Sequence, residues 1–204
     1  MTPTDHPRTP FSDSPPAAAP VPARASEHGD AAGLSRAAAL ISTTPDFPAS
    51  GVLFRDVTPL LSDPRAYRDV LDAMAAPFRA ADGSPAFDLV AGIEARGFVM
   101  AGGLAAATAT GVLPIRKAGK LPDPQVTVEY GLEYAEAAIE SSGDLTGMRV
   151  LLVDDVLATG GTLRAARTVV ERLGGAVTGS AVILELEELR GRTLVPSCHT
   201  VFRV

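Results

Sequence analysis

The sequence predicts an α/β fold in which a central parallel sheet is flanked by helices. Short apolar runs without polar alternation recur along the chain, at residues 87–93, 111–117, 148–156 and 176–186. Helical patterns follow two of these runs, at 98–109 and 162–175. Strands buried on both faces are uniformly apolar, and strands that take turns with helices form a parallel sheet. The ligands of such sheets bind at the carboxyl ends of the strands.

Two segments carry the clearest helix signals. In residues 63–80, Asp63 is a suitable N-cap and Pro64 occupies the first helical position. Apolar residues then recur at helical spacing and form a stripe that faces the core: Tyr67, Val70, Leu71, Met74 and Phe78. Segment 162–175 has a comparable apolar face, and Gly174 and Gly175 end it. A shorter helix is expected within residues 33–42.

The domain organisation follows from a change in composition near residue 33. Residues 1–33 are rich in Pro, Ala and Ser and have few large apolar side chains. Such a segment buries too little apolar surface to offset the entropy lost on ordering, so we expect a disordered tail. Residues 34–204 have the length and the apolar content of one domain.

Charge and cysteine content exclude several classes of function. The net charge of −6 argues against nucleic-acid binding and against an acidic membrane surface. The single cysteine, Cys198, permits no intramolecular disulfide and fits a reducing compartment, so we expect a cytoplasmic protein. The uncharged stretch Gly97–Ile115 is rich in Ala, Gly and Thr, which favours a buried helix and a strand over a membrane span.

The segment "RVLLVDDVLATGGTLRA" (149–165) carries the strongest chemical signal. Small residues between a strand and a helix N-terminus predict an anion site, and Thr159 and Thr162 add hydroxyl donors. The absence of a Lys after the glycines argues against a triphosphate-binding loop of the Walker type, and the spacing differs from the dinucleotide fingerprint. The adjacent Asp154 and Asp155 suit vicinal sugar hydroxyls or a divalent cation. A ribose 5-phosphate satisfies both halves of the motif.

The same segment resembles the phosphoribosyl-diphosphate (PRPP) loop of the type I phosphoribosyltransferases, and in particular of the adenine phosphoribosyltransferases. Four further segments resemble that family in the same order, and together the resemblance covers roughly residues 34–190: "FPASGVLFRDVTPLL" (47–61), "GIEARGF" (92–98), "RKAGKLP" (116–122) and "VEYGLEYAEAAIE" (128–140). Two positions depart from the family pattern: Ser50 stands where Pro is common, and Ala135 where Gly is common.

The resemblance implies a type I phosphoribosyltransferase fold with a small hood over the base site. It implies transfer of 5-phosphoribose from PRPP to adenine, which yields AMP and diphosphate in purine salvage. It further implies Mg²⁺ bound mainly through PRPP, with Asp154 and Asp155 as candidate protein ligands, and a homodimer. Two alternatives stay open: a phosphoribosyltransferase for another purine base, and a non-catalytic PRPP-binding regulator.

The resemblance also assigns roles to individual residues. The catalytic set is Glu133, Asp154 and Asp155, in which Glu133 handles the adenine ring proton and the aspartates hold the ribose. The 5-phosphate is expected at Ala158, Thr159, Gly160, Gly161 and Thr162. The diphosphate is expected at Arg96, Arg116, Lys117 and Lys120. The base is expected at Leu53, Phe54 and Arg55. A lid between Ala118 and Tyr134, in which Tyr134 helps to position the substrate, is expected to exclude water.

Overall fold

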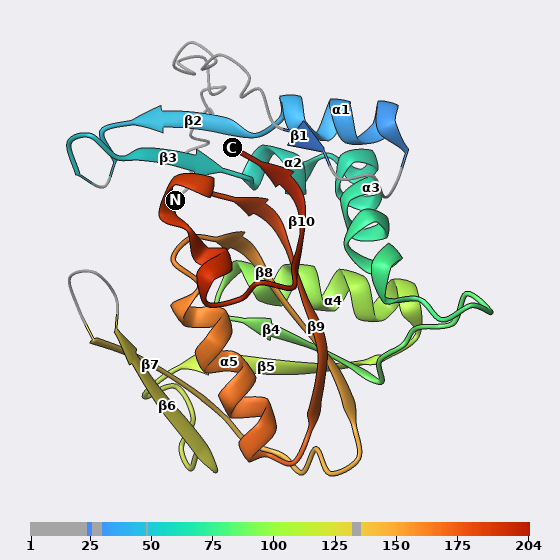
Figure 1. Ribbon diagram of the computed structural model, residues 1–204, viewed down its shortest axis with the longest axis vertical. Helices are drawn as coiled ribbons and strands as arrows, with labels where there is room; N and C mark the ends of the chain where they lie inside the picture. Colours follow the sequence, from blue (N-terminus) through green and yellow to red (C-terminus); the bar gives the residue numbers. More distant parts are fainter. Residues whose placement is uncertain (1–23, 26–29, 48, 132–135) are drawn as a thin grey trace, which may run out of the picture.

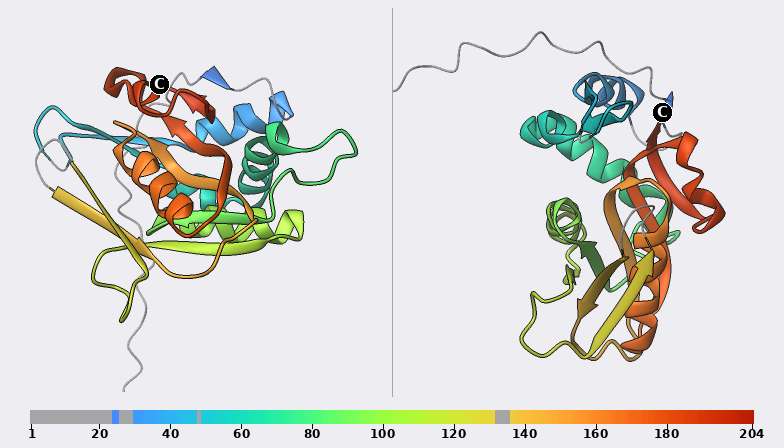
Figure 2. Two further views of the ribbon diagram at one scale, coloured as in Figure 1. Left: turned by 60° about the horizontal axis from the view of Figure 1, so that its bottom comes forward. Right: turned by 90° about the vertical axis from the view of Figure 1, so that its left-hand side faces the viewer.

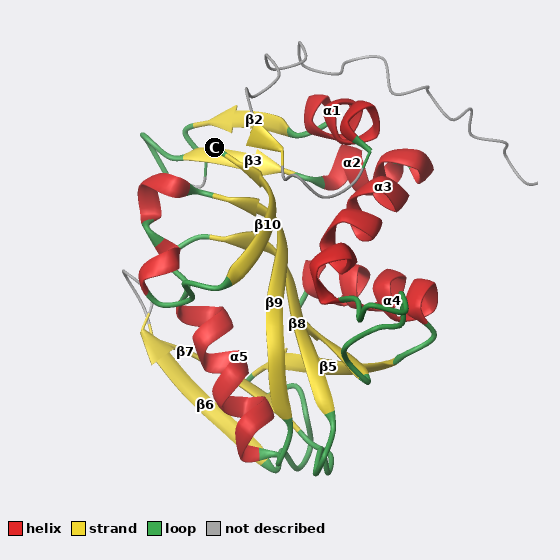
Figure 3. Ribbon diagram, turned by 45° about the vertical axis from the view of Figure 1, so that its right-hand side comes forward, coloured by secondary structure: helices red, strands yellow, loops and turns green. Residues whose placement is uncertain are grey.

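The computed structural model describes residues 24–25, 30–47, 49–131 and 136–204, and they form a sheet of eight strands with helices on both faces (Figures 1 and 3). The strand order is β1-β10-β9-β8-β4-β5-β7-β6. The five inner strands are parallel: β10 (Cys198–Arg203), β9 (Ala176–Glu185), β8 (Arg149–Leu157), β4 (Leu89–Ile93) and β5 (Gly111–Lys117). The outer ones are antiparallel: β1 (Arg24–Ala25), β7 (Glu136–Ser141) and β6 (Val126–Gly131). The predicted α/β class is therefore confirmed.

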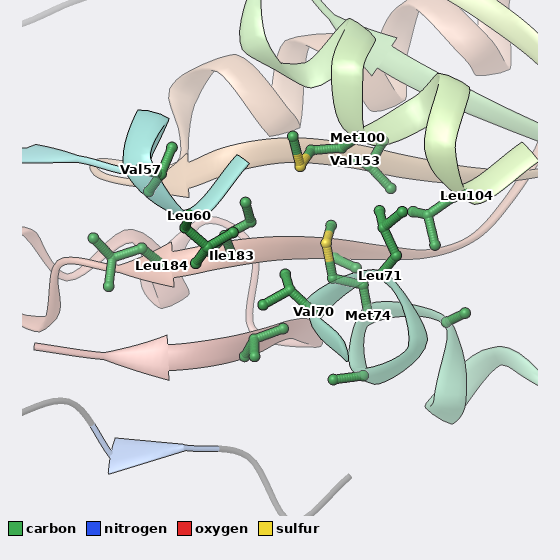
Figure 4. Packing of buried hydrophobic residues seen from close by; sticks show 14 of the residues in the cluster. Val57, Leu60, Val70, Leu71, Met74, Met100, Leu104, Val153, Ile183 and Leu184 are labelled. Atoms are coloured by element: carbon green, nitrogen blue, oxygen red, sulfur yellow. The ribbon is translucent and has the colours of Figure 1, made fainter. Parts of the chain in front are cut away.

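Strand β8 shows why the inner strands are uniformly apolar. Leu151 and Val153 face one way and join a core with helices α3 (Pro64–Ala75) and α4 (Arg96–Thr108), part of which Figure 4 shows. Val150 and Leu152 face the other way and join a core with helix α5 (Gly161–Arg172). Because both faces are covered, polar alternation along this strand would bury unpaired groups.

Helix α3 follows its sequence signals. The Asp63 side chain accepts hydrogen bonds from the backbone N–H groups of Arg65 and Ala66, at 3.0 and 2.8 Å. The helix ends at Ala75 and continues as the 3₁₀ turn η1 (Ala76–Phe78), earlier than the predicted end at residue 80. Pro77 explains the difference: Ala76 before it is still helical, but proline has no backbone N–H to donate to the carbonyl oxygen four residues earlier.

The other predicted elements lie within a few residues of their expected bounds. Helix α4 begins at Arg96, two residues before the predicted Phe98, and α5 begins at Gly161. The first helix, α1 (Ala31–Ala39), starts earlier than expected because Asp30 caps it through Gly33 N, at 2.9 Å. The predicted disordered tail falls mostly on residues outside the described part of the chain.

Two hairpins lack a counterpart among the expected elements. One pairs β2 (Ser42–Pro45) with β3 (Leu53–Asp56), and with α1 and α2 (Thr58–Ser62) it forms the hood at one end of the molecule (Figure 2). An ion pair of 2.6 Å between Arg36 and Asp69 ties α1 to α3. The other hairpin pairs β6, which lies in the segment expected to be a lid, with β7, which follows that segment. Both hairpins project from the same side of the molecule (Figures 1 and 2).

The C-terminal part adds two 3₁₀ turns, η2 (Glu187–Leu189) and η3 (Gly191–Thr193), before strand β10. No helix in the described part of the chain has both the length and the apolar character that crossing a bilayer requires.

Candidate active site

A cavity of about 620 Å³ opens where strands β4, β5 and β8 end. This edge is where ligands of parallel sheets bind. Five of the predicted site residues line it: Arg96, Lys117, Asp154, Asp155 and Thr162. The other residues of its wall are Ile93, Glu94, Ala95, Ala118, Tyr130, Ala137, Ala138 and Ile139. The cavity therefore combines acidic and basic side chains from three strand ends.

The two aspartates have different surroundings. Asp155 is 6% exposed, and its Oδ2 lies 2.6 Å from Arg96 Nε as an ion pair. That contact lacks hydrogen-bond geometry, and Oδ2 accepts no hydrogen bond from the described residues. Asp155 N donates to Asp154 Oδ1 at 3.0 Å. Burial, together with the neighbouring Asp155 carboxylate, raises the pKa of Asp154 well above its usual range. The Arg96 guanidinium thus balances the charge of Asp155, whereas Asp154 keeps its proton to a higher pH than an ordinary aspartate does.

The loop after the aspartates surrounds a second cavity of about 90 Å³. Its wall includes Ala158, Thr159, Gly160 and Thr162, and Thr162 is shared with the larger cavity. Gly160 is the N-cap of α5, has φ of +84° and provides no side-chain cap. The first backbone N–H groups of α5 therefore lack a side-chain acceptor at the cap, which suits them to bind an anion.

The four predicted cations are only partly brought together. Arg96 and Lys117 line the large cavity, whereas Arg116 and Lys120 are absent from its wall. Arg116 Nε lies 3.8 Å from Glu94 Oε2, which also accepts a hydrogen bond of 2.9 Å from Lys117 N. Arg116 Nη1 lies 3.5 Å from the carbonyl oxygen of Lys120. These contacts hold Arg116 and Lys120 next to the cavity.

A buried carboxylate fixes the start of the segment between β5 and β6. Glu140, on β7, is 2% exposed and accepts hydrogen bonds from the N–H groups of Gly119 (3.0 Å), Lys120 (2.7 Å) and Leu121 (2.7 Å). Burial raises the pKa of Glu140, but these three donors together with Arg116 outweigh it, and the net shift is downward. Glu140 thereby holds the loop that carries Lys120.

The hood brings an aromatic group to the edge of the site. The Phe54 ring meets the Phe47 ring edge-on, with centroids 5.2 Å apart, and Arg96 Cζ lies 5.9 Å from its centroid. Arg55 Nη1 donates to Thr43 Oγ1 across the β2–β3 hairpin, and Leu53 is half-exposed. None of the three predicted base-site residues lines the cavity, but Phe54 lies next to Arg96, which does.

Comparison with known proteins identifies the family and the fold of the chain. A family model described as a phosphoribosyl transferase domain matches residues 56–202. An adenine phosphoribosyltransferase of Nocardioides sp. is 50% identical over 165 residues, which cover 80% of this chain and 89% of the relative. The chain belongs to the adenine phosphoribosyltransferase family.

Solved structures of the family have the same fold. The adenine phosphoribosyltransferase of Rhodothermus marinus aligns with a TM-score of 0.78 and 40% identity, and the alignment covers 86% of this chain and all of that one. The Saccharomyces cerevisiae enzyme, solved with adenine and an imino-altritol 1,6-bisphosphate, aligns with a TM-score of 0.76 and 31% identity, over 84% of this chain and 98% of that one. The family reaction is the formation of AMP from adenine and PRPP, so this phosphoribosyltransferase is a pentosyl-transfer enzyme.

The residues of the cavity region that are missing from the predicted set include Tyr130 and Glu140. Tyr130 lines the cavity and lies on the same face of β6 as Val126 and Val128, so the period-two alternation of these apolar residues was a usable signal. Glu140 had no such signal, because its three partners lie about twenty positions earlier in the chain. Glu133 and Tyr134 lie outside the described residues, and their roles stay predictions.

Proposed function

We propose that the cavity at the ends of β4, β5 and β8 is the place where 5-phosphoribose passes from PRPP to adenine. One observation carries this proposal. The Asp154–Asp155 pair and the cations Arg96 and Lys117 line one cavity, the anion loop lines a second, and Thr162 belongs to the walls of both. PRPP offers groups that match these elements: vicinal hydroxyls for the aspartates, a 5-phosphate for the loop and a diphosphate for the cations.

The aspartates would hold the ribose. Its hydroxyl groups can donate hydrogen bonds to Asp154 and Asp155, which favours their ionised forms. As the bond from the anomeric carbon to the diphosphate breaks, positive charge develops on the sugar. Carboxylates fixed beside it stabilise that charge without reorganising. The loop Ala158–Thr162 would hold the 5-phosphate through backbone N–H groups and the hydroxyls of its two threonines.

The departing diphosphate would be held by cations. Arg96 and Lys117 line the cavity, and Arg96 can form two parallel hydrogen bonds with a phosphate oxygen pair. Arg116 and Lys120 would reach the diphosphate from beside the cavity. The bond to the anomeric carbon forms from a ring nitrogen of adenine, and the proton of that nitrogen would pass to Glu133.

The hood would hold the base. Phe54 can stack on the purine ring, and backbone groups at Leu53 and Arg55 would read its edge. Stacking of a base on an aromatic ring contributes about 1–3 kcal/mol. Tyr134 and the lid would then exclude water, which competes with adenine for the anomeric carbon.

Mg²⁺ is part of the proposal, and the residues present fit it. The described residues contain no cluster of three or more His, Cys, Asp or Glu that could hold a metal. Asp154 and Asp155 place two carboxylates in the cavity wall, and Asp155 Oδ2, although paired with Arg96, accepts no hydrogen bond from the described residues. This donor set matches the way Mg²⁺ uses one or two carboxylates plus substrate oxygens. Bound in this way, Mg²⁺ would neutralise charge on the diphosphate.

A homodimer and a cytoplasmic location complete the proposal. The half-exposed Val99 on α4 and Val112 on β5 are apolar groups that a second copy would cover. Light scattering on the purified protein tests the dimer. The single, buried Cys198 supports a reducing compartment.

The test is AMP formation from adenine and PRPP with Mg²⁺. We expect Asp155→Asn to lower kcat/KM by about tenfold or more, which corresponds to about 1.4 kcal/mol of barrier. Asp72→Asn, which alters an exposed surface pair, is the matched control and is expected to leave the rate unchanged. Equal rates for all three proteins would contradict the site assignment.

A further inference from the structure

The turn η3, which precedes β10, packs against the back of the phosphate loop with no side chain between the two backbones. A Cβ atom built on Gly160 would lie 2.6 Å from the carbonyl oxygen of Gly191. A Cβ built on Gly191 would overlap the carbonyl oxygen of Ala158. Gly191 is buried. Because both approaches are closer than any Cβ tolerates, each backbone segment fixes the position of the other.

Arg192 fastens this turn to the sheet. Its Nε donates to Glu185 Oε2 at 2.9 Å, and its Nη2 donates to Thr200 Oγ1 at 3.1 Å. Its Nη1 donates to the carbonyl oxygens of Cys198, at 2.9 Å, and Pro196, at 3.3 Å. Glu185 is the last residue of β9 and is 3% exposed. A single guanidinium therefore joins η3 to both β9 and β10 through charge-assisted hydrogen bonds, which are stronger than neutral ones.

We propose that the Gly191–Arg192 turn sets the position of the phosphate loop, and that Arg192 is a positioning residue for the substrate's 5-phosphate. This rests on the proposed role of Ala158–Thr162 as the phosphate cradle. Arg192 lines neither cavity and acts through Gly191. Binding groups must lie within a few tenths of an ångström of their productive positions, so a displaced Ala158–Gly160 backbone weakens phosphate binding.

Two variants test the contact from opposite sides. Arg192→Met removes the attachment of the turn, and Gly191→Ala keeps every ion pair but forces the Ala158 carbonyl away. The readouts are the inhibition constants of ribose 5-phosphate, which has the 5-phosphate and the sugar but no diphosphate, and of diphosphate itself. We expect both variants to raise KM for PRPP and Ki for ribose 5-phosphate about tenfold. Ki for diphosphate should stay within about twofold, and kcat should fall less than KM rises.

The chain offers matched controls. Arg203 lies 3.4 Å from Glu185 and donates to Thr200, but it belongs to β10 and does not hold the turn. Gly102 has no atom within 4 Å of a built Cβ. Arg203→Met and Gly102→Ala should therefore leave both inhibition constants within about twofold. Arg192→Lys keeps the charge but cannot reach all the partners at once, so we expect an intermediate Ki for ribose 5-phosphate.

The outcomes separate this inference from the proposed function. All assays are run at a temperature at which circular dichroism shows every variant folded. If Arg192→Met and Gly191→Ala weaken both inhibitors equally, or neither, the turn does not position the phosphate loop. Thr162→Ala, within the cradle, tests the underlying assignment. If it leaves Ki for ribose 5-phosphate unchanged, the cradle itself is wrong; if it alone raises that Ki, only the inference on the turn is overturned.

Discussion

The sharpest stability prediction concerns Gly160, where the backbone excludes any side chain for two separate reasons. Its φ of +84° is a conformation that costs an L-residue about 1–2 kcal/mol. The Cβ of an alanine would also lie 2.6 Å from the Gly191 carbonyl oxygen, and a rigid backbone must shift to relieve the overlap, at about 1–2 kcal/mol more. We therefore expect Gly160→Ala to lower the free energy of unfolding by about 2–4 kcal/mol.

Gly161 provides a control in the adjacent position. A Cβ there would meet Gly131 O and Tyr130 Cδ2 at 3.5 Å, which is ordinary contact, and its φ is not in the left-handed region. Gly161→Ala should change stability by less than about 1 kcal/mol, since alanine favours the helix that begins there. Urea unfolding followed by circular dichroism measures both. Similar losses for the two variants would refute the backbone argument.

Three further predictions address charge, anchoring and stacking. Asp154→Asn should stabilise the unliganded protein near neutral pH and lower its activity. Because burial and Asp155 raise the pKa of Asp154, the folded state keeps a proton that the unfolded chain loses above pH 3.8, and the unfolding free energy of the parent protein falls as the pH rises from 3.8 to the raised pKa. Urea titrations at several pH values should show that this slope is lost in the variant. Glu140→Gln places an N–H₂ group against backbone donors and should raise KM for PRPP about fivefold or more, while the exposed Glu129→Gln should leave it unchanged in the same steady-state assay. Phe54→Leu should raise KM for adenine about fivefold or more and leave KM for PRPP unchanged; an unchanged adenine KM would remove Phe54 from the base site.

The sequence predicts the centre of the fold better than its edges. Strand β5 has the expected bounds, 111–117, and α3 begins at its expected cap, because apolar runs and capping residues are local signals. Strand β10 and the strands of the two hairpins, among them β6, were missed. β10 is mostly buried, but His199 and Thr200 interrupt its apolar residues. β6 is half-buried and is stabilised by pairing with β7. Pairing of that kind leaves a weaker local pattern than burial on both faces.

The same distinction applies to the site. The acidic pair and the phosphate loop are contiguous between residues 154 and 162, so their chemistry could be inferred from one stretch. Lys117 and Arg116 are neighbours with different surroundings: one lines the cavity and the other faces Glu94. Which of these two residues lines the cavity depends on how β5 lies against the end of β4, and the resemblance alone did not indicate that.

Two helix N-termini explain how an acidic pair can lie inside a site for a polyanion. Helix α5 begins at the phosphate loop, and α4 begins with Arg96, the partner of Asp155. A Cβ on Gly97 would lie 3.0 Å from Asp154 Oδ1, so α4 approaches β8 closely where it has no side chain. Each helix start favours negative charge. The carboxylates between them disfavour a third anion but accept hydroxyl donors. The arrangement therefore matches a ligand with two anionic ends and a neutral, hydroxyl-bearing centre, and it selects against one that carries an anionic group in place of a sugar hydroxyl.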